Sequence, residues 1–237
     1  MPRFHLPPEQ WTETPFLDGT EAKHLAQVLR IQPGQTITVF DGRGSRAEAK
    51  VLSVSKQRVD LMLELAESHD TPLPEITLAQ AIPKGKNMEW IVQKAVELGV
   101  SKIQPLVTRH TIVSPGDDKA EKWRRIALEA CKQCGQDTIP IIEDPLDFTQ
   151  WIANQDTAEL KILASLAENP KNFRETLQSH PDLEAITVAI GPEGDFSEDE
   201  TTAAIAAGFI PVTLGNLVLR VETATMLCLS AIRFQYI

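Results

Sequence analysis

Hydrophobic and polar residues alternate in the first third of the chain, and this spacing predicts short strands. Residues 36–40 alternate as a strand, residues 41–44 form a glycine-containing turn, and residues 47–54 and 58–65 continue the strand pattern. Residues 22–29 differ, because their apolar positions are three and four apart, as in a helix. We therefore predict an all-β unit with one short helix, folded as a small barrel.

Further along, apolar runs of strand length alternate with helical patterns, which predicts a parallel sheet covered by helices. The predicted strands are residues 75–82, 103–107, 161–166, 185–190 and 210–214. One predicted helix has an apolar face between Met88 and Leu98 and ends at Gly99, and another contains Trp123. The polar, proline-containing residues 69–74 suit a linker. We expect one domain over residues 1–70 and a second over 71–237.

Two turn-rich segments each leave a predicted strand and enter a predicted helix. The first reads Gly191-Pro192-Glu193-Gly194-Asp195-Phe196-Ser197, and the second extends from Leu214 to Met226. Ser197 with Glu200 forms a capping box that starts a helix ending before Gly208. Open α/β sheets bind ligands beyond the carboxyl ends of their strands, so both segments are candidates for a binding site.

Charge neither excludes nor demands a nucleic-acid partner. The net charge of the 237 residues is −10, divided as −2 over residues 1–70, +3 over 71–135 and −11 over 136–237. The middle of the chain is therefore mildly basic, and RNA binding is permitted. No apolar run reaches the roughly 20 residues that a membrane span needs, and the start lacks the apolar core of a signal peptide. We expect a cytoplasmic protein.

Motifs of several common enzyme classes are absent from the sequence. There is no dinucleotide-binding glycine motif, no phosphate-binding P-loop and no Gly-x-Ser-x-Gly, and the histidines are scattered. Cys131 and Cys134 have the spacing of metal ligands, but they share a helical stripe with Trp123 and Ala127. We expect both thiols in the core and no metal site, since structural zinc needs four ligands. A cofactor held by loops remains.

Several separated motifs resemble the RsmE family of ribosomal RNA uridine-N3 methyltransferases, which belongs to the SPOUT superfamily. They are Ile-Gly-Pro-Glu-Gly at 190–194, Leu-Gly-(x)3-Leu-Arg-x-Glu-Thr-Ala at 214–224, Lys-Gly-Lys-Asn-Met-Glu-Trp at 84–90 and Met-Pro-Arg-Phe at 1–4. The resemblance implies an α/β fold, with a deep trefoil knot in a C-terminal parallel sheet and an N-terminal PUA-like β-barrel that binds RNA. It also implies a homodimer built on the knot and the last helix.

The resemblance further implies that three loops bind S-adenosylmethionine through backbone groups, with glycines avoiding steric clash. Matched by position, the cofactor-binding residues are Leu163, Ala164, Ser165, Leu166, Gly191, Pro192, Glu193, Gly194, Leu214, Gly215, Asn216, Val218, Leu219, Arg220, Glu222, Thr223 and Ala224. The substrate would be small-subunit ribosomal RNA or the assembled subunit. The expected RNA contacts are Arg3, Arg30, Arg43, Arg46, Lys84 and Lys86.

The implied reaction is methyl transfer to N3 of a uracil, whose proton must be removed or whose anion must be stabilised. Arg220 is the first catalytic candidate, because its guanidinium could stabilise the oxyanion at a uracil carbonyl. Glu222, the second, could orient Arg220 or favour its helix. A structural salt bridge from Arg220 to Glu222 or Glu193 is the alternative interpretation. No general base is identified.

Two departures from the family pattern concern RNA recognition. Asp195 replaces a glycine or apolar residue and adds negative charge, and Asn216-Leu217 replaces a common Pro-Arg, which removes a positive charge. The last helix supports the dimer through an apolar face of Met226, Leu227, Leu229, Ser230 and Phe234. Two other functions stay open, namely a knotted methyltransferase with another target, such as a transfer RNA ribose, and a catalytically silent RNA-binding protein.

Overall fold

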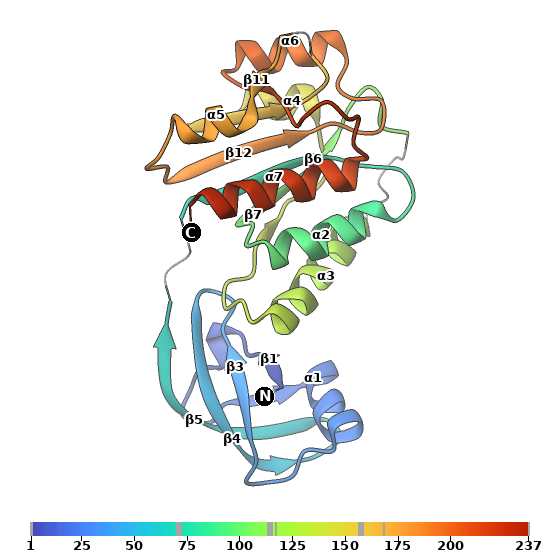
Figure 1. Ribbon diagram of the computed structural model, residues 1–237. Coiled ribbons are helices and arrows are strands. Elements are labelled where there is room, and N and C mark those ends of the chain that lie inside the picture. The colour runs from blue at the N-terminus through green and yellow to red at the C-terminus, as the bar shows by residue number, and fades with distance from the viewer. Residues whose placement is uncertain are drawn as a thin grey trace. The chain divides into compact units, whose positions relative to one another are not determined.

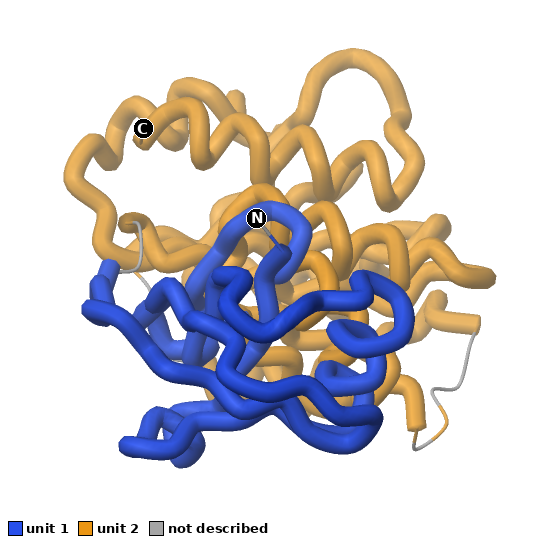
Figure 2. The backbone as a smooth tube through the Cα atoms, turned by 90° about the horizontal axis from the view of Figure 1, so that it is seen from below, with its two compact units in different colours: residues 1–71, 131–139 blue, residues 72–130, 140–237 orange. Residues whose placement is uncertain are grey.

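The computed structural model describes residues 2–69, 73–112, 116, 118–155, 159–167 and 169–236. The chain packs as two compact units, which Figure 2 shows in different colours. The first contains residues 1–71 and 131–139, and the second contains residues 72–130 and 140–237. The predicted linker lies where the first unit gives way to the second, although its residues 70–72 lie outside the described residues. The return of residues 131–139 to the first unit was not predicted.

The first unit is a curled sheet with helical turns (Figure 1). Its strands lie in the order β1-β3-β4-β5-β2, in which β1 pairs parallel with β3 and the other neighbours pair antiparallel. The strands are β1 (Arg3–His5), β2 (Phe16–Asp18), β3 (Thr36–Phe40), β4 (Ser45–Val54) and β5 (Arg58–Ser68). The helical turns are η1 (Pro8–Gln10), α1 (Gly19–Lys23) and η2 (His24–Leu29), the last of which is wound as a π-helix.

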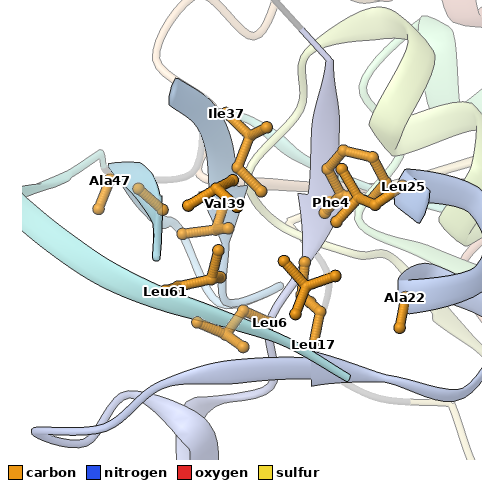
Figure 3. Close-up of a cluster of buried hydrophobic side chains, with 12 residues drawn as sticks. Phe4, Leu6, Leu17, Ala22, Leu25, Ile37, Val39, Ala47 and Leu61 are labelled. Carbon is orange, nitrogen blue, oxygen red and sulfur yellow. The ribbon is translucent and has the colours of Figure 1, made fainter. Parts of the chain in front are cut away.

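One face of the curled sheet encloses the core of this unit (Figure 3). Ala47, Ala49 and Val51 of β4 are buried, whereas the intervening Glu48 and Lys50 are exposed or partly exposed. This alternation is the period-two pattern that predicted the strand. Phe4, Leu6, Leu17 and Leu25 pack against the same cluster from β1, β2 and the helical turns, as Figure 3 shows. The predicted strands and the short helix of this unit are confirmed.

Residues 131–139 pack against the turn that follows β3. Ile139 N–H donates to the Gly42 carbonyl at 2.9 Å, and a Cβ built on Gly42 would lie 2.7 Å from the Ile139 side chain. Arg3 forms a 2.6 Å ion pair with Asp137, with 14% of the Arg3 side chain and 9% of the Asp137 side chain exposed. Long-range polar contacts therefore tie this segment to the first unit, and no local sequence pattern encodes them.

The second unit is a parallel sheet flanked by helices (Figure 1). Its strands lie in the order β11-β13-β10-β12-β6-β7-β8, with β9 also paired to β7, and every pairing among them is parallel. The strands are β6 (Glu75–Ala81), β7 (Lys102–Val107), β8 (Ile141–Ile142), β9 (Leu146–Asp147), β10 (Leu160–Ala164), β11 (Lys171–Asn172), β12 (Ala185–Ile190) and β13 (Ile210–Thr213). The predicted parallel sheet is confirmed, whereas the threading of its last loop as a knot stays a prediction.

The helices of this unit start and end largely where local signals place them. They are α2 (Asn87–Glu97), α3 (Lys119–Cys134), α4 (Phe148–Ala153), α5 (Phe173–Gln178), α6 (Glu198–Ala206) and α7 (Val221–Gln235). Gly99, with φ +75°, follows the end of α2, and the capping box of Ser197 and Glu200 starts α6. In the described part of the chain, no helix has the length and apolar character to cross a membrane.

Two expectations were wrong, one for the end of α3 and one for β10. Cys131 is fully buried on α3, but Cys134 is exposed, because α3 ends at this residue and its last turn presents the thiol to solvent. The strand expected over residues 161–166 ends at Ala164, so that Ser165 and Leu166 already belong to the following loop.

Candidate functional site

Three loops meet at the carboxyl edge of the parallel sheet. They follow β10, β12 and β13, which lie side by side in the order β13-β10-β12. Parallel neighbours end at the same edge, so the loops starting at Ser165, Gly191 and Leu214 converge although they are about 25 residues apart in sequence. The two segments singled out in the sequence are thus brought together with a third.

The three loops surround a cavity of about 450 Å³. This volume lies within the range of about 300–1,000 Å³ found for small-molecule sites. Most of the predicted cofactor-binding residues line it, namely Ala164, Ser165, Leu166, Gly191, Pro192, Glu193, Leu214, Gly215, Val218, Leu219, Arg220, Glu222 and Ala224. The structure therefore brings these residues together, while their contacts with a cofactor stay a prediction.

Four predicted residues do not line the cavity. Leu163 lies within β10 with its side chain buried in the sheet core, since alternate residues of a strand point to opposite faces. Gly194 faces His110, whose Cβ lies 3.2 Å from a Cβ built on the glycine. Asn216 and Thr223 are sequence neighbours of lining residues but are not among the residues that line the cavity.

Further residues line the cavity without having been predicted, namely Asn87, Ile190, Asp195, Thr213, Leu217 and Val221. Asn87 is the least expected, because it opens α2 and is far in sequence from the three loops. Its Nδ2 donates to Glu222 Oε2 at 3.4 Å. The Lys84–Glu89 stretch had been noticed as a motif, but only its lysines had been given a role.

Asp195 fastens two of the loops to each other. Its carboxylate accepts hydrogen bonds from Leu166 N–H at 2.6 Å and from Phe196 N–H at 2.8 Å. Its own backbone has φ +58°, a left-handed conformation that aspartate tolerates better than most residues. The carboxylate that departed from the family pattern is thus engaged by backbone N–H groups inside the wall of the cavity.

Glu193 and Glu222 contact the start of α2 and the residues just before it at the cavity rim. Glu193 Oε1 accepts a hydrogen bond from Lys84 N–H at 2.9 Å, and Glu222 accepts from Asn87. Neither carboxylate forms an ion pair with Arg220, and none is found for Arg220 within the described residues. The alternative of a structural salt bridge is therefore wrong here, and the Arg220 guanidinium remains available to a ligand.

A buried polar contact anchors the helix that carries Arg220 at its start. Thr225 Oγ1 donates to Gln80 Oε1 at 2.7 Å, and both side chains are fully buried. Gln80 Nε2 in turn donates to the Ala81 carbonyl at 2.9 Å. The first turn of α7 is thereby fixed to strand β6, which sets the position of Arg220 and Glu222.

Glycines shape the cavity in two different ways. Gly215 has φ +121°, and a Cβ built on it meets no atom within 4 Å, so a side chain there would enter open space beside the cavity. A Cβ on Gly191 would instead lie 2.7 Å from Asp195 Oδ1. The loop itself therefore requires glycine at 191, which differs from the expectation that this glycine makes room for a ligand.

The side chains predicted to contact RNA differ in their exposure and in their ion pairing. Arg30, Arg43, Lys84 and Lys86 are exposed, whereas Arg46 is partly exposed and pairs with Glu67 at 2.9 Å. Arg3 is held by Asp137 inside the first unit, which leaves its guanidinium engaged. Arg3 is therefore better explained as a structural residue than as a phosphate contact.

Two of the cysteines have buried thiols. Burial, with a smaller effect of Cys134, raises the pKa of the Cys131 thiol to about 12, and burial also raises the pKa of Cys228. Such thiols stay protonated, whereas metal ligation needs the thiolate. Among the described residues, no cluster of His, Cys, Asp and Glu side chains suits a metal ion.

Comparison with known sequences identifies relatives along most of the chain. Residues 69–233 match the RNA methyltransferase domain family, and residues 17–64 match the RNA methyltransferase PUA domain family. Ribosomal RNA small subunit methyltransferase E from Synechocystis sp. is 36% identical, over 97% of this chain and 76% of that protein. The Bacillus subtilis protein of the same name is 30% identical, over 97% of this chain and 94% of its own.

Solved structures agree with these matches. Ribosomal RNA small subunit methyltransferase E from Neisseria gonorrhoeae, bound to S-adenosyl methionine, has a TM-score of 0.88 at 31% identity, covering 100% of this chain and 98% of that one. A Legionella pneumophila protein solved with its cofactor SAM has a TM-score of 0.88 at 32% identity, covering 98% and 96%. The chain described here belongs to the ribosomal RNA small subunit methyltransferase E family.

Proposed function

We propose that this protein transfers the methyl group of S-adenosylmethionine to N3 of a uridine in 16S ribosomal RNA of the small subunit. The observation that carries the proposal is the three-loop cavity with Arg220 at its rim. Among the described residues that line this cavity, Arg220 is the one with a positive charge. Two solved relatives, at 31% and 32% identity, have this cofactor bound, and the name of the Neisseria gonorrhoeae protein specifies the small-subunit RNA.

The chemistry of the cavity fits that cofactor. Apolar side chains such as Leu166 and Leu219 suit its adenine, and the surrounding turns offer backbone N–H and C=O groups to the edge of the base. When bound, the cofactor supplies a methyl group on a positively charged sulfur. Glu193, Asp195 and Glu222 bring carboxylates to the same cavity, which favours a cationic ligand.

We assign the Arg220 side chain to the uracil rather than to a contact within the protein. It immediately precedes the first turn of α7 and has no ion-pair partner among the described residues. Its guanidinium would stabilise the negative charge that develops on a uracil carbonyl as N3 loses its proton. Glu222 is bonded to Asn87 and would position this rim of the cavity, while solvent accepts the proton.

RNA binding by the first unit is the second part of the proposal. Its match to an RNA methyltransferase PUA domain supports this role, and Arg30 and Arg43 are the exposed cations that we assign to phosphate contacts. Lys84 and Lys86 would add contacts beside the cavity. Since the proposed substrate is ribosomal RNA, we place the protein in the cytoplasm.

We also propose a homodimer formed through α7. Leu227 and Phe234 are exposed by 42% and 86%, and Leu217 and Val218 add apolar surface in the loop before the helix. Leu229 does not belong to this face, because it is fully buried in the second unit. Light scattering should give a molar mass twice that of one chain, and the Phe234→Glu variant should have the mass of a single chain.

Nucleoside analysis tests the proposed reaction. Small ribosomal subunits that lack the modification are incubated with the protein and labelled S-adenosylmethionine, and the RNA is then digested and separated. The proposal predicts label in 3-methyluridine, greatly reduced in Arg220→Gln. Label in a 2′-O-methylated nucleoside would identify a ribose methyltransferase instead. Cofactor binding without any transfer would favour a catalytically silent RNA-binding protein.

A further inference from the structure

A groove of about 680 Å³ runs between helices α2 and α3 of the second unit. All the residues that line it belong to the second unit, and Figure 1 shows the two helices next to each other. Trp90 lines the groove from α2 and is 44% exposed, which is unusual for so large an apolar side chain. The functional site described above makes no use of this groove.

The lining of the groove has a small excess of positive charge in a chain that is acidic as a whole. Helix α3 carries five lysines and arginines against two glutamates, although the net charge of the protein is −10. Lys86, Lys122 and Arg125 line the groove, together with Glu89 and Glu129. In the sequence, the positive charge of residues 71–135 was taken to permit RNA binding, and Lys86 was expected to contact RNA, whereas Lys122 and Arg125 were given no role.

Two of these cations remain available to a ligand. Lys122 Nζ is engaged, since it donates to Glu89 Oε1 at 2.6 Å. The side chains of Lys86 and Arg125 are exposed, and within the described residues neither has an ion pair or a hydrogen bond. The groove therefore offers an aromatic face flanked by two uncompensated positive charges.

The groove adjoins the rim of the three-loop cavity. Lys86 lines the groove, and the next residue, Asn87, lines the cavity and donates to Glu222. Lys84, two residues earlier, is fixed to Glu193 through its backbone N–H. A chain molecule lying along the groove would thus reach the cavity without crossing to the other unit.

We propose that the α2–α3 groove binds an unpaired segment of the substrate RNA beside the target nucleotide. Trp90 stacks on one base, and Lys86 and Arg125 contact the adjoining phosphates. This combination of an exposed aromatic ring and backbone-tracking cations is what single-stranded nucleic acids require. The inference rests on the proposed function in taking ribosomal RNA as the substrate, and it adds where that RNA lies.

A second copy of the chain fits the groove less well. Interface cores are depleted of charged residues, whereas this groove is lined mainly by charged and polar side chains around Trp90 and Ile126. Any base can stack on an exposed indole, and the negative phosphates attract the side chains of Lys86 and Arg125. RNA is therefore the occupant that the lining favours.

The test compares four variants of the full chain, namely Trp90→Ala, Trp90→Phe, Arg125→Gln and, as a control, Arg174→Gln. Arg174 is an exposed arginine of α5 in the same unit, away from the groove. Methyl transfer to small subunits gives KM for the RNA and kcat, and calorimetry gives the affinity for S-adenosylmethionine. Binding of a fluorescein-labelled oligouridine is measured across a range of salt concentrations.

Trp90→Ala should raise KM for the RNA about 5- to 100-fold, the loss expected when one base stack is removed. Trp90→Phe should restore much of the affinity, because a phenyl ring still stacks. Arg125→Gln should reduce the salt slope of oligouridine binding by about one, as for a lost phosphate contact. Arg174→Gln should leave KM for the RNA and the salt slope of oligouridine binding unchanged, and the affinity for S-adenosylmethionine should be the same in all four variants.

Three results would overturn the inference, and they differ from a failure of the proposed reaction. Trp90→Ala could leave KM and oligouridine affinity at the wild-type values. It could instead halve the mass in solution without changing RNA binding, which would make the groove an interface between copies. Trp90→Ala could also weaken cofactor binding as much as RNA binding, which would indicate a general structural defect. If the wild type methylates no RNA, the oligouridine-binding measurement still tests whether the groove binds RNA.

Discussion

Asp195 is the residue whose replacement best tests how the wall of the cavity is held. Asp195→Gly removes the carboxylate and leaves the left-handed backbone at φ +58° free of strain. The bond lost between the loops is the one from Leu166 N–H, at 2.6 Å. The bond from Phe196 N–H, at 2.8 Å, is local to the same turn. The substitution therefore isolates the contact that joins the β10 and β12 loops.

The size of the effect follows from the type of bond. A hydrogen bond to a charged group contributes about 1.5–3 kcal/mol, and the partial exposure of Asp195 places it near the lower end. If the loss is expressed as disorder of the Leu166 loop in the free protein, cofactor affinity falls by the corresponding factor of about ten. We predict a dissociation constant raised about 3- to 15-fold, with little change in melting temperature.

Calorimetric titration with S-adenosylmethionine measures this change. Asp195→Asn should give an intermediate value, because its single carbonyl oxygen can serve only one of the two N–H groups. Asn169→Gly is the control, since it introduces glycine at another left-handed position, φ +53°, in the loop that contains Leu166. Wild-type cofactor affinity in Asp195→Gly would refute the reasoning. A gain in RNA affinity alone would show that the charge of Asp195 matters through repulsion instead.

Two further predictions concern the interior. Thr225→Val leaves the buried Gln80 carbonyl oxygen without its 2.7 Å donor and should lower the free energy of unfolding by about 1–3 kcal/mol, measured by urea denaturation. Adding Gln80→Leu should recover most of that loss, and strict additivity of the two changes would contradict a coupled pair. At pH 8 a thiol reagent should modify Cys134 rapidly. It should modify Cys131, whose pKa burial raises to about 12, and the buried Cys228 only after the protein unfolds. Rapid modification of three thiols in the native protein would contradict the burial of Cys131 and Cys228.

Local patterns predicted the framework of the protein well. The strand at residues 185–190 and the capping box of Ser197 and Glu200 depend on neighbouring residues, which the sequence displays directly. The candidate loops after β12 and β13 also followed from the sequence, because open α/β sheets bind ligands beyond the carboxyl ends of their strands, whereas the loop after β10 came from the family resemblance. These rules placed the candidate site at the edge of the sheet where the cavity lies.

Such local patterns could not predict the contacts between residues that are distant in sequence. Nothing near Asn87 indicates that Glu222 will accept its amide, and nothing near Arg3 indicates that Asp137 will neutralise it. Asp195 was interpreted by its charge, whereas its role comes from the direction of its side chain toward Leu166 N–H. Pairings of this kind are settled by tertiary packing, which overrides local preference.

Two glycines at the ends of β13 test directly whether the three-loop cavity is the cofactor site. Gly215 lines the cavity with φ +121°, Gly208 lies at the opposite end with φ +89°, and both have open space around them. Leucine at either position meets similar backbone strain, but only Gly215→Leu places a side chain at the cavity. Calorimetry should show S-adenosylmethionine binding to the wild type and Gly208→Leu and none to Gly215→Leu. Equal binding by the two variants would contradict the placement of the site.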